Sequence, residues 1–355
     1  MRHDHAGPRP GADLAARSVK GRPVSGQPYT LAALQAAARS VHAVMPATPQ
    51  YRWPQLEAAF ARQPGDGTAL WLKHENHSPV GAFKIRSGIV YFERLAAAGQ
   101  LPAGVVSATR GNHGQSIAYA AARHGVPALI VVPHGNSREK NAAMRALGAE
   151  LVEAGDDFQA AREQAQALAA QRGWLMVPSF HSDLVAGVAS YALELFAAAP
   201  KLDEVYVPIG LGSGACGLIA ARDALGLATR IVGVVSTGAP AYALSLAQGR
   251  AVSHAVSTQL ADGMACRTPE LGALAMLQGG LARLVSVSDS QVAQAMRQLF
   301  ETTHQVAEGA GAAALAAAWQ DRGRLAAQRT ALVLSGGNVD CDVFAGVLSG
   351  ALFQE

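Results

Sequence analysis

Residues 105–132 have the sequence VVSATRGNHGQSIAYAAARHGVPALIVV, which contains one complete strand–helix–strand unit. Val105–Ala108 and Ala128–Val132 are short apolar runs, as expected for strands that are buried on both faces. Gly114–Arg123, between them, predicts a helix. Apolar strands that alternate with helices indicate a parallel sheet covered by helices on both sides.

The same alternation continues in both directions along the chain. We therefore predict an α/β fold, in which ligands bind at the carboxyl ends of the strands. A helix is expected over residues 31–45, before Pro49. The other predicted strands are Ala69–Lys73, Glu150–Glu153, Leu175–Pro178, Val205–Pro208, Ile231–Val235 and Ala331–Leu334, and the other predicted helices are Phe83–Ala98, Arg138–Leu147, Asp157–Gln171, Ala186–Ala198 and one from about Gly217.

The composition excludes several classes of protein. The chain has 355 residues, half of them apolar and 15% charged, so it can bury a large core. A net charge of only +3 argues against a nucleic-acid surface. Three widely spaced cysteines argue against a disulfide framework and fit a reducing, cytoplasmic location. Residues 1–27 lack the apolar core of a secretory signal, and we predict that they form a flexible arm. No apolar run is long enough to span a membrane.

Lys84 lies in the segment PVGAFKIR, residues 79–86, where a turn leads into a predicted helix. Apolar neighbours and the positive end of a helix both disfavour an ammonium group, so we expect the pKa of Lys84 to be lowered. A neutral lysine amine can attack an aldehyde and form a Schiff base. On this segment alone, the alternative of a solvated surface lysine stands, because most lysines are exposed.

Two loops predict anion sites. Residues 109–115 (TRGNHGQ) and residues 210–217 (GLGSGACG) each follow a predicted strand and lead into a helix, an arrangement that points backbone N–H groups at an anion. Asn112 could instead be a helix cap. A dinucleotide site is disfavoured at the second loop, because the next strand ends in Ser236 and Thr237 and not in an acidic residue.

These segments together resemble the fold-type-II pyridoxal-phosphate enzymes, and within them the threonine/serine dehydratase family. The matching motifs are K-H-E-N at 73–76, G-A-F-K-I-R at 81–86, G-N-H-G-Q at 111–115, the glycine loop after V-P-I at 207–209 and S-G-G-N at 335–338. They occur in the family's order between Lys73 and Asp340. His113 favours the dehydratase and racemase branch. Val80 departs from the usual Ser or Thr.

The resemblance implies roles for particular residues. Lys84 would carry pyridoxal 5'-phosphate, and the Ser335 hydroxyl would bond the pyridine nitrogen, so both are expected to be catalytic. Asn112 would bond the cofactor's 3-oxygen. The other expected cofactor-binding residues are Phe83, Gly210, Leu211, Gly212, Ser213 and Gly214. The expected substrate-binding residues are Thr109, Arg110, Gly111 and His113, and the five backbone amides from Thr109 to His113 would hold the substrate carboxylate.

Arg110 departs from the family, which usually has a small residue, often serine, before this glycine. In serine racemases that serine is the second catalytic base. Arginine cannot accept a proton at working pH, so elimination is favoured over racemisation. We hypothesise that Arg110 pairs with a substrate side-chain carboxylate, as in 3-hydroxyaspartate. The alternative is that Arg110 faces solvent or pairs with an Asp or Glu of the protein.

Further departures predict absences. The strand Ile231–Val235 does not end in Glu-Pro, so no metal site is expected there, and Asp262 is expected only to cap a turn. The chain ends soon after Asp340, so no regulatory domain of the biosynthetic threonine-dehydratase type is expected.

The predicted function is pyridoxal-phosphate-dependent elimination of water from a β-hydroxy amino acid such as threonine, serine or 3-hydroxyaspartate. A 2-oxo acid and ammonia would be the products. The alternatives are a diaminopropionate-type ammonia-lyase or another amino-acid β-eliminase of the same fold. Less favoured are a racemase, a cofactor-binding protein without turnover and a nicotinamide dehydrogenase. The resemblance also implies a homodimer. It further implies two domains with helix-covered parallel sheets, as in the tryptophan synthase β chain. The large cofactor-binding domain would comprise residues 28–103 and 181–355, and the small mobile domain residues 104–180.

Overall fold

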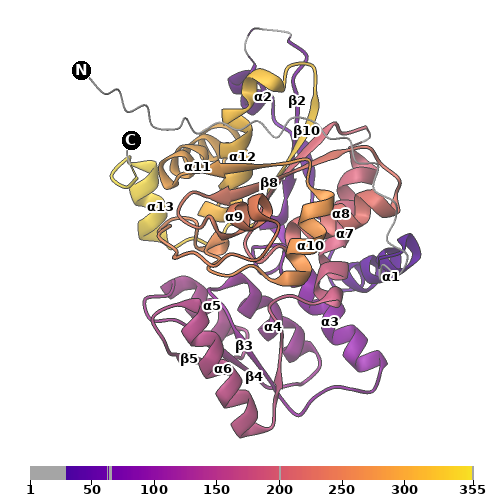
Figure 1. Cartoon of the computed structure of the whole chain (residues 1–355), viewed down its shortest axis with the longest axis vertical. Coiled ribbons are helices and arrows are strands. Elements are labelled where there is room, and N and C mark those ends of the chain that lie inside the picture. The colour runs from indigo at the N-terminus through magenta and orange to yellow at the C-terminus, as the bar shows by residue number, and fades with distance from the viewer. Residues whose placement is uncertain (1–28, 62, 64–65, 200, 354–355) are drawn as a thin grey trace, which may run out of the picture.

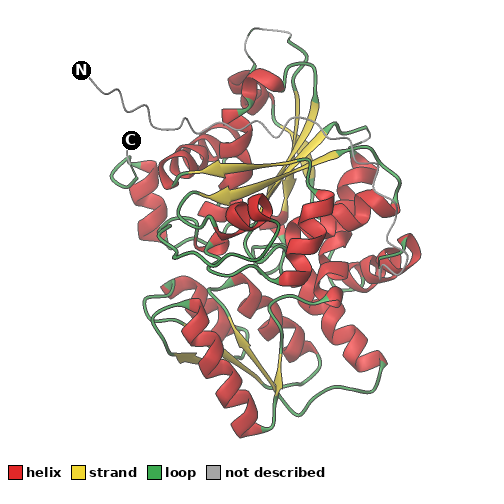
Figure 2. Cartoon of the chain, viewed as in Figure 1, coloured by secondary structure: helices red, strands yellow, loops and turns green. Residues whose placement is uncertain are grey.

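A computed structural model describes residues 29–61, 63, 66–199 and 201–353. The predicted N-terminal arm, residues 1–27, lies outside these residues. Two helix-covered sheets make up the described chain, and Figures 1 and 2 show the larger above the smaller. The α/β class predicted from the sequence is confirmed. The proposed domain boundaries remain a prediction.

The larger sheet has the strand order β1-β2-β10-β7-β8-β9. All neighbours are parallel except β1, which runs antiparallel to β2. β10, the last strand in sequence, therefore lies inside the sheet, between β2 and β7. The strands are β1 Gln50–Arg52, β2 Ala69–His74, β7 Glu204–Pro208, β8 Arg230–Ser236, β9 Arg283–Val287 and β10 Arg329–Leu334.

Both faces of the larger sheet are buried, because alternate side chains of a strand point to opposite faces. Ala331 and Val333 pack into one core cluster and Leu332 and Leu334 into the other. The first cluster lies under α1 Leu31–His42, α3 Ile85–Ala97, α7 Ser182–Ala198, α8 Ser213–Ala224, α9 Ala241–Gln248 and α10 Leu271–Gly280, and the second under α2 Pro54–Phe60, α11 Asp289–Thr303, α12 Gly309–Gln320 and α13 Cys341–Leu348.

The smaller sheet is entirely parallel, with the order β5-β4-β3-β6. Leu129 and Val131 face one core cluster and Ile130 and Val132 the other, which matches the continuous apolar run in the sequence. Its strands are β3 Val105–Ala108, β4 Ala128–Val132, β5 Glu150–Glu153 and β6 Leu175–Met176, and its helices are α4 Asn112–Arg123, α5 Arg138–Ala146 and α6 Phe158–Arg172.

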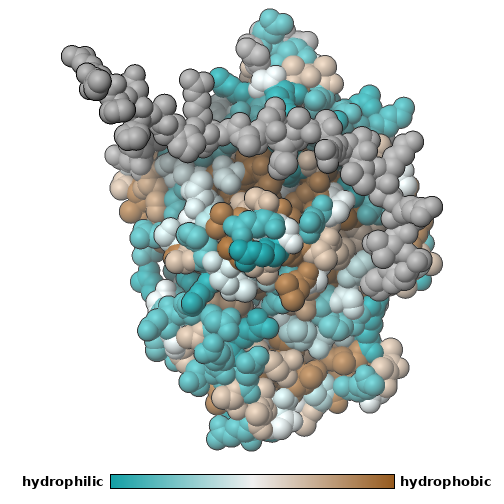
Figure 3. All heavy atoms as spheres, viewed as in Figure 1, coloured by the Kyte–Doolittle hydropathy of each residue, from teal (hydrophilic) through white to brown (hydrophobic). Residues whose placement is uncertain are grey.

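On the face in Figure 3, hydrophobic side chains form small groups between hydrophilic ones. Every helix in the described part of the chain is too short or too polar to cross a membrane.

Several elements were not predicted. β9 was missed because most of its side chains are half-buried or exposed, which leaves only a weak apolar signal. α12 was missed because its sequence, GAGAAALAAAWQ, is apolar all round and has no amphipathic period. The helix predicted over 31–45 ends earlier, at His42.

Candidate active site

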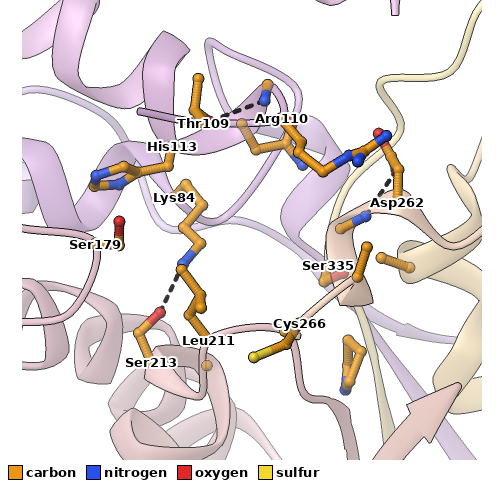
Figure 4. Close-up of a pocket in the computed structure, with 18 of the residues that line it drawn as sticks. Lys84, Thr109, Arg110, His113, Ser179, Leu211, Ser213, Asp262, Cys266 and Ser335 are labelled. Carbon is orange, nitrogen blue, oxygen red and sulfur yellow. Dashed lines mark hydrogen bonds between the residues drawn. The ribbon is translucent and has the colours of Figure 1, made fainter. Parts of the chain in front are cut away.

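One cavity lies where the loops after β3, β7 and β10 meet the start of α3 (Figure 4). Because parallel strands end together at one edge, these loops converge although they are far apart in sequence. Every site residue predicted from the sequence lines this cavity: Phe83, Lys84, Thr109, Arg110, Gly111, Asn112, His113, Gly210, Leu211, Gly212, Ser213, Gly214 and Ser335.

Lys84 is the N-cap residue of α3, and its side chain extends into the cavity (Figure 4). Its Nζ donates a hydrogen bond of 2.8 Å to the Ser213 hydroxyl. Burial lowers the pKa of Lys84 to about 8, with a smaller opposing effect of the Cys216 thiol. The lowered pKa expected from the sequence is confirmed, and desolvation is its main cause.

This pKa predicts how attachment of an aldehyde to Lys84 depends on pH. Only the neutral amine attacks, and at pH 7 a pKa of about 8 leaves about 10% of the amine neutral, against about 0.03% for an ordinary lysine. We expect the rate at which pyridoxal phosphate attaches to the cofactor-free protein to rise about tenfold per pH unit below pH 8 and to level off above it. Stopped-flow absorbance between pH 6 and 10 measures this. A rate that still rises steeply at pH 9.5 would contradict a buried amine.

The glycine loop lines the cavity and leads into α8. Tyr242 donates a hydrogen bond to the carbonyl of Leu211 at 3.1 Å, and Tyr191 donates one to the carbonyl of Gly214 at 2.9 Å. These bonds hold two carbonyls away from an anion, while the first-turn amides of α8 lack partners within the helix. Gly212 has φ +96°, a conformation that favours glycine. A Cβ on Gly210 would lie 2.2 Å from the Gly263 carbonyl oxygen, so this approach also requires glycine.

The asparagine loop is braced from two sides. Asn112 donates to a Glu308 carboxylate oxygen at 2.6 Å, and its own oxygen accepts from Asn338 at 2.9 Å. Thr109 accepts the N–H groups of Gly111, at 2.9 Å, and Gly114, at 3.2 Å. The N–H of Thr109 donates to the Val131 carbonyl. Two of the five amides assigned to the substrate carboxylate, those of Thr109 and Gly111, are therefore already engaged within the protein.

Two buried side chains in the cavity lack partners in the described chain. Ser335 is 4% exposed, and its hydroxyl takes part in none of the hydrogen bonds among the described residues. Neither ring nitrogen of His113 has a hydrogen-bond partner there. Burial, and secondarily the charge of Lys84, lowers the pKa of His113 to about 3, so its ring is neutral.

Arg110 is half-buried and lines the cavity, and none of the ion pairs between described residues involves it. Its Nε is buried and has no acceptor. Pairing of Arg110 with an Asp or Glu of the protein, one of the alternatives left open by the sequence, is therefore not found in the described chain.

The sequence did not predict a charged group made by Lys140, Asp262 and Glu308. Lys140 Nζ lies 2.6 Å from an Asp262 oxygen and 2.9 Å from a Glu308 oxygen, and all three line the cavity. Burial raises the pKa of Glu308, Lys140 opposes that shift and Asp262 adds to it. The expectation that Asp262 only caps a turn is wrong: it accepts the Gly263 N–H and also pairs with Lys140. The partners are too far apart in sequence for any spacing to reveal them.

Among the residues that the structure describes, no three His, Cys, Asp or Glu side chains are grouped as metal ligands.

Comparisons with a family model, with known sequences and with solved structures give consistent results. Residues 46–336 match the family described as pyridoxal-phosphate dependent enzyme. An L-threonine ammonia-lyase of Geobacter sulfurreducens is 34% identical over 287 residues, which cover 81% of this chain and 71% of that protein. An L-threo-3-hydroxyaspartate ammonia-lyase of Saccharomyces cerevisiae is 30% identical over 80% of this chain and 87% of that protein. The crystal structure of a threonine deaminase from T.th. is similar, with a TM-score of 0.78 and 33% identity over 88% of this chain and 99% of that one.

Proposed function

This chain belongs to the family of pyridoxal-phosphate-dependent enzymes, and from its cavity we propose that it converts a β-hydroxy amino acid into a 2-oxo acid and ammonia. The observation that carries the proposal is the buried amine of Lys84, which has a lowered pKa and faces the glycine loop. The similarity to ammonia-lyases that act on threonine and 3-hydroxyaspartate supports a β-hydroxy substrate.

The residues of the cavity fit pyridoxal phosphate. An aldehyde needs a neutral amine, which Lys84 supplies. A phosphate needs converging N–H groups, which the loop from Gly210 to Gly214 offers at the start of α8. A pyridine nitrogen needs a hydrogen-bond donor, and the Ser335 hydroxyl, which has no partner in the described chain, can be that donor. The ring's 3-oxygen can accept a hydrogen bond from the Asn112 amide, in place of the Glu308 carboxylate that now accepts it.

When bound, the cofactor supplies an electron sink that makes the α-proton of an amino acid acidic. Lys84 Nζ is the base that takes this proton, and Ser213 holds the amine in the cavity at 2.8 Å. The remaining loop amides, those of Arg110, Asn112 and His113, bind the α-carboxylate. His113 stays neutral beside the amine, so it adds no charge that would compete for the substrate. The substrate loses one water, and one water is taken up as ammonia leaves.

Elimination is favoured over racemisation by residue 110. Racemisation needs a second group that exchanges a proton on the face of Cα opposite the lysine. Arg110 is the residue immediately before Gly111, and its guanidinium is protonated at every working pH. A permanently protonated side chain cannot be that base.

The test is a substrate panel with the cofactor-loaded protein: L-threonine, L-serine, 3-hydroxyaspartate and 2,3-diaminopropionate. Release of 2-oxo acid and ammonia is measured together. Equal amounts of the two products from a β-hydroxy substrate support the proposal. Two ammonias per 2-oxo acid from the diamino substrate alone would identify a diaminopropionate-type lyase. Bound cofactor without 2-oxo acid from any substrate would overturn the proposed elimination.

A further inference from the structure

Lys140 and Arg110, two cationic side chains of the cavity, differ in their partners. Lys140 is buried, and its ammonium lies 2.6 Å from Asp262 and 2.9 Å from Glu308. The Lys140 ammonium therefore already has two carboxylate partners. Arg110 has none among the described residues.

Arg86, in contrast to Arg110, is a buried arginine with protein partners. Arg86 is fully buried and donates to Glu75, Glu194, Ser190 and Thr48. The Arg110 Nε is also buried, yet it donates to no atom of the described chain. A desolvated guanidinium N–H without an acceptor is costly, so the position is suited to a ligand that supplies one.

Arg110 is placed to meet a substrate. It lines the inner cavity together with Lys84, and it also lines an outer hollow formed with Asp157, Arg267 and His254. Figure 4 shows its side chain extending from the loop after β3 toward the Asp262 side of the cavity, away from His113. The Asp157 carboxylate in the outer hollow does not neutralise Arg110, because it is paired with Arg267 at 2.9 Å.

We propose that Arg110 forms a second anion subsite, which binds the side-chain carboxylate of the substrate, so that the preferred substrate is a four-carbon β-hydroxy amino acid with two carboxylates. This inference rests on the proposed elimination and names its substrate class. The planar fork of a guanidinium matches a carboxylate in two-point hydrogen bonding. The α-carboxylate is met by loop amides, which leaves Arg110 for the distal one. A methyl group in its place, as in threonine, leaves the buried Nε of Arg110 without an acceptor.

The experiment compares kcat/KM for 3-hydroxyaspartate and for L-threonine in the cofactor-loaded enzyme and in its Arg110→Ala and Arg110→Lys variants. We expect the wild type to prefer 3-hydroxyaspartate and Arg110→Ala to lower that preference by about 100-fold, the usual effect of removing one partner of a desolvated charged pair. Arg110→Lys keeps the charge without the fork and restores part of the preference. Arg267→Ala is the matched control: it removes a nearby cation that already has a carboxylate partner, and it should leave the preference intact.

A second measurement does not depend on turnover. Succinate and butyrate have four carbons each and lack the amino group, so binding of each to the cofactor-loaded protein can be followed by calorimetry. Succinate should bind more tightly than butyrate, and Arg110→Ala should abolish the difference. If no substrate is turned over but this difference is present, the elimination fails and the subsite stands. The subsite is overturned if the wild type prefers threonine. It is also overturned if Arg110→Ala lowers kcat/KM equally for both substrates and leaves succinate binding unchanged.

Discussion

Lys84→Ala should lower kcat for 2-oxo acid formation by at least about 10⁴-fold, because it removes both the cofactor's point of attachment and the base for the α-proton. Lys140 is the only other described lysine that lines the cavity, and its ammonium is held by Asp262 and Glu308. Those carboxylates raise the pKa of Lys140 in spite of its burial, so it cannot replace the missing amine. The variant should also lack the absorbance of the attached cofactor.

Two readouts separate attachment from activity. Borohydride reduction followed by peptide mass analysis should place the cofactor on Lys84 in the wild type and on no single lysine in the variant. Lys201→Ala is the matched control, since Lys201 is exposed and lies outside the cavity. Retained turnover in Lys84→Ala, or a reduced adduct on another lysine of the wild type, would remove the basis of the proposed function.

The second large effect is expected on stability. Arg86→Met should lower the free energy of unfolding by about 3–5 kcal/mol, since it removes the arginine that pairs with two buried carboxylates. Arg86 Nε lies 2.7 Å from Glu75, and its Nη1 lies 2.6 Å from Glu194. Burial alone would lower the pKa of Arg86, but Glu75 and Glu194 raise it. Lys73 shares Glu194 at 2.6 Å, so the substitution disturbs a group that joins β2, α3 and α7.

Urea unfolding followed by circular dichroism measures this loss. Arg52→Ala is the control, because it also removes an arginine–glutamate pair: Arg52 lies 2.6 Å from Glu57, but 47% of its side chain is exposed. A loss below about 1 kcal/mol is expected there. Equal losses in the two variants would show that the buried group contributes no more than a surface pair. Because Arg86 follows Lys84 by two residues in the first turn of α3, Arg86→Met should also weaken cofactor retention.

Much of the site could be predicted from the sequence because its motifs are local. The loop at Gly111 lies between β3 and α4, and the loop at Gly212 between β7 and α8. Strand, turn and helix signals depend on neighbouring residues, and parallel strands bring their carboxyl ends to one edge. The predicted residues consequently line a single cavity. Their chemical roles remain predictions that the substitutions above test.

Other features had no local signal. Lys140 and Asp262 are 122 residues apart, and Asn112 and Glu308 are 196 apart, so no spacing predicts these contacts. The uniformly apolar α12 has no amphipathic pattern, because it is buried on nearly every side.

By itself, then, the amino-acid sequence determined the alternation of strands and helices, the position of Lys84 at the start of a helix and the two loops that lead from a strand into a helix, since each depends on residues within one turn or strand. Which charges neutralise one another was decided only by the tertiary structure. Electrostatic compensation depends on distance in space and on burial, and neither can be read from order along the chain. That is why Lys140 proved to be paired while Arg110, in the same cavity, has no carboxylate partner in the described chain and can receive one from a ligand.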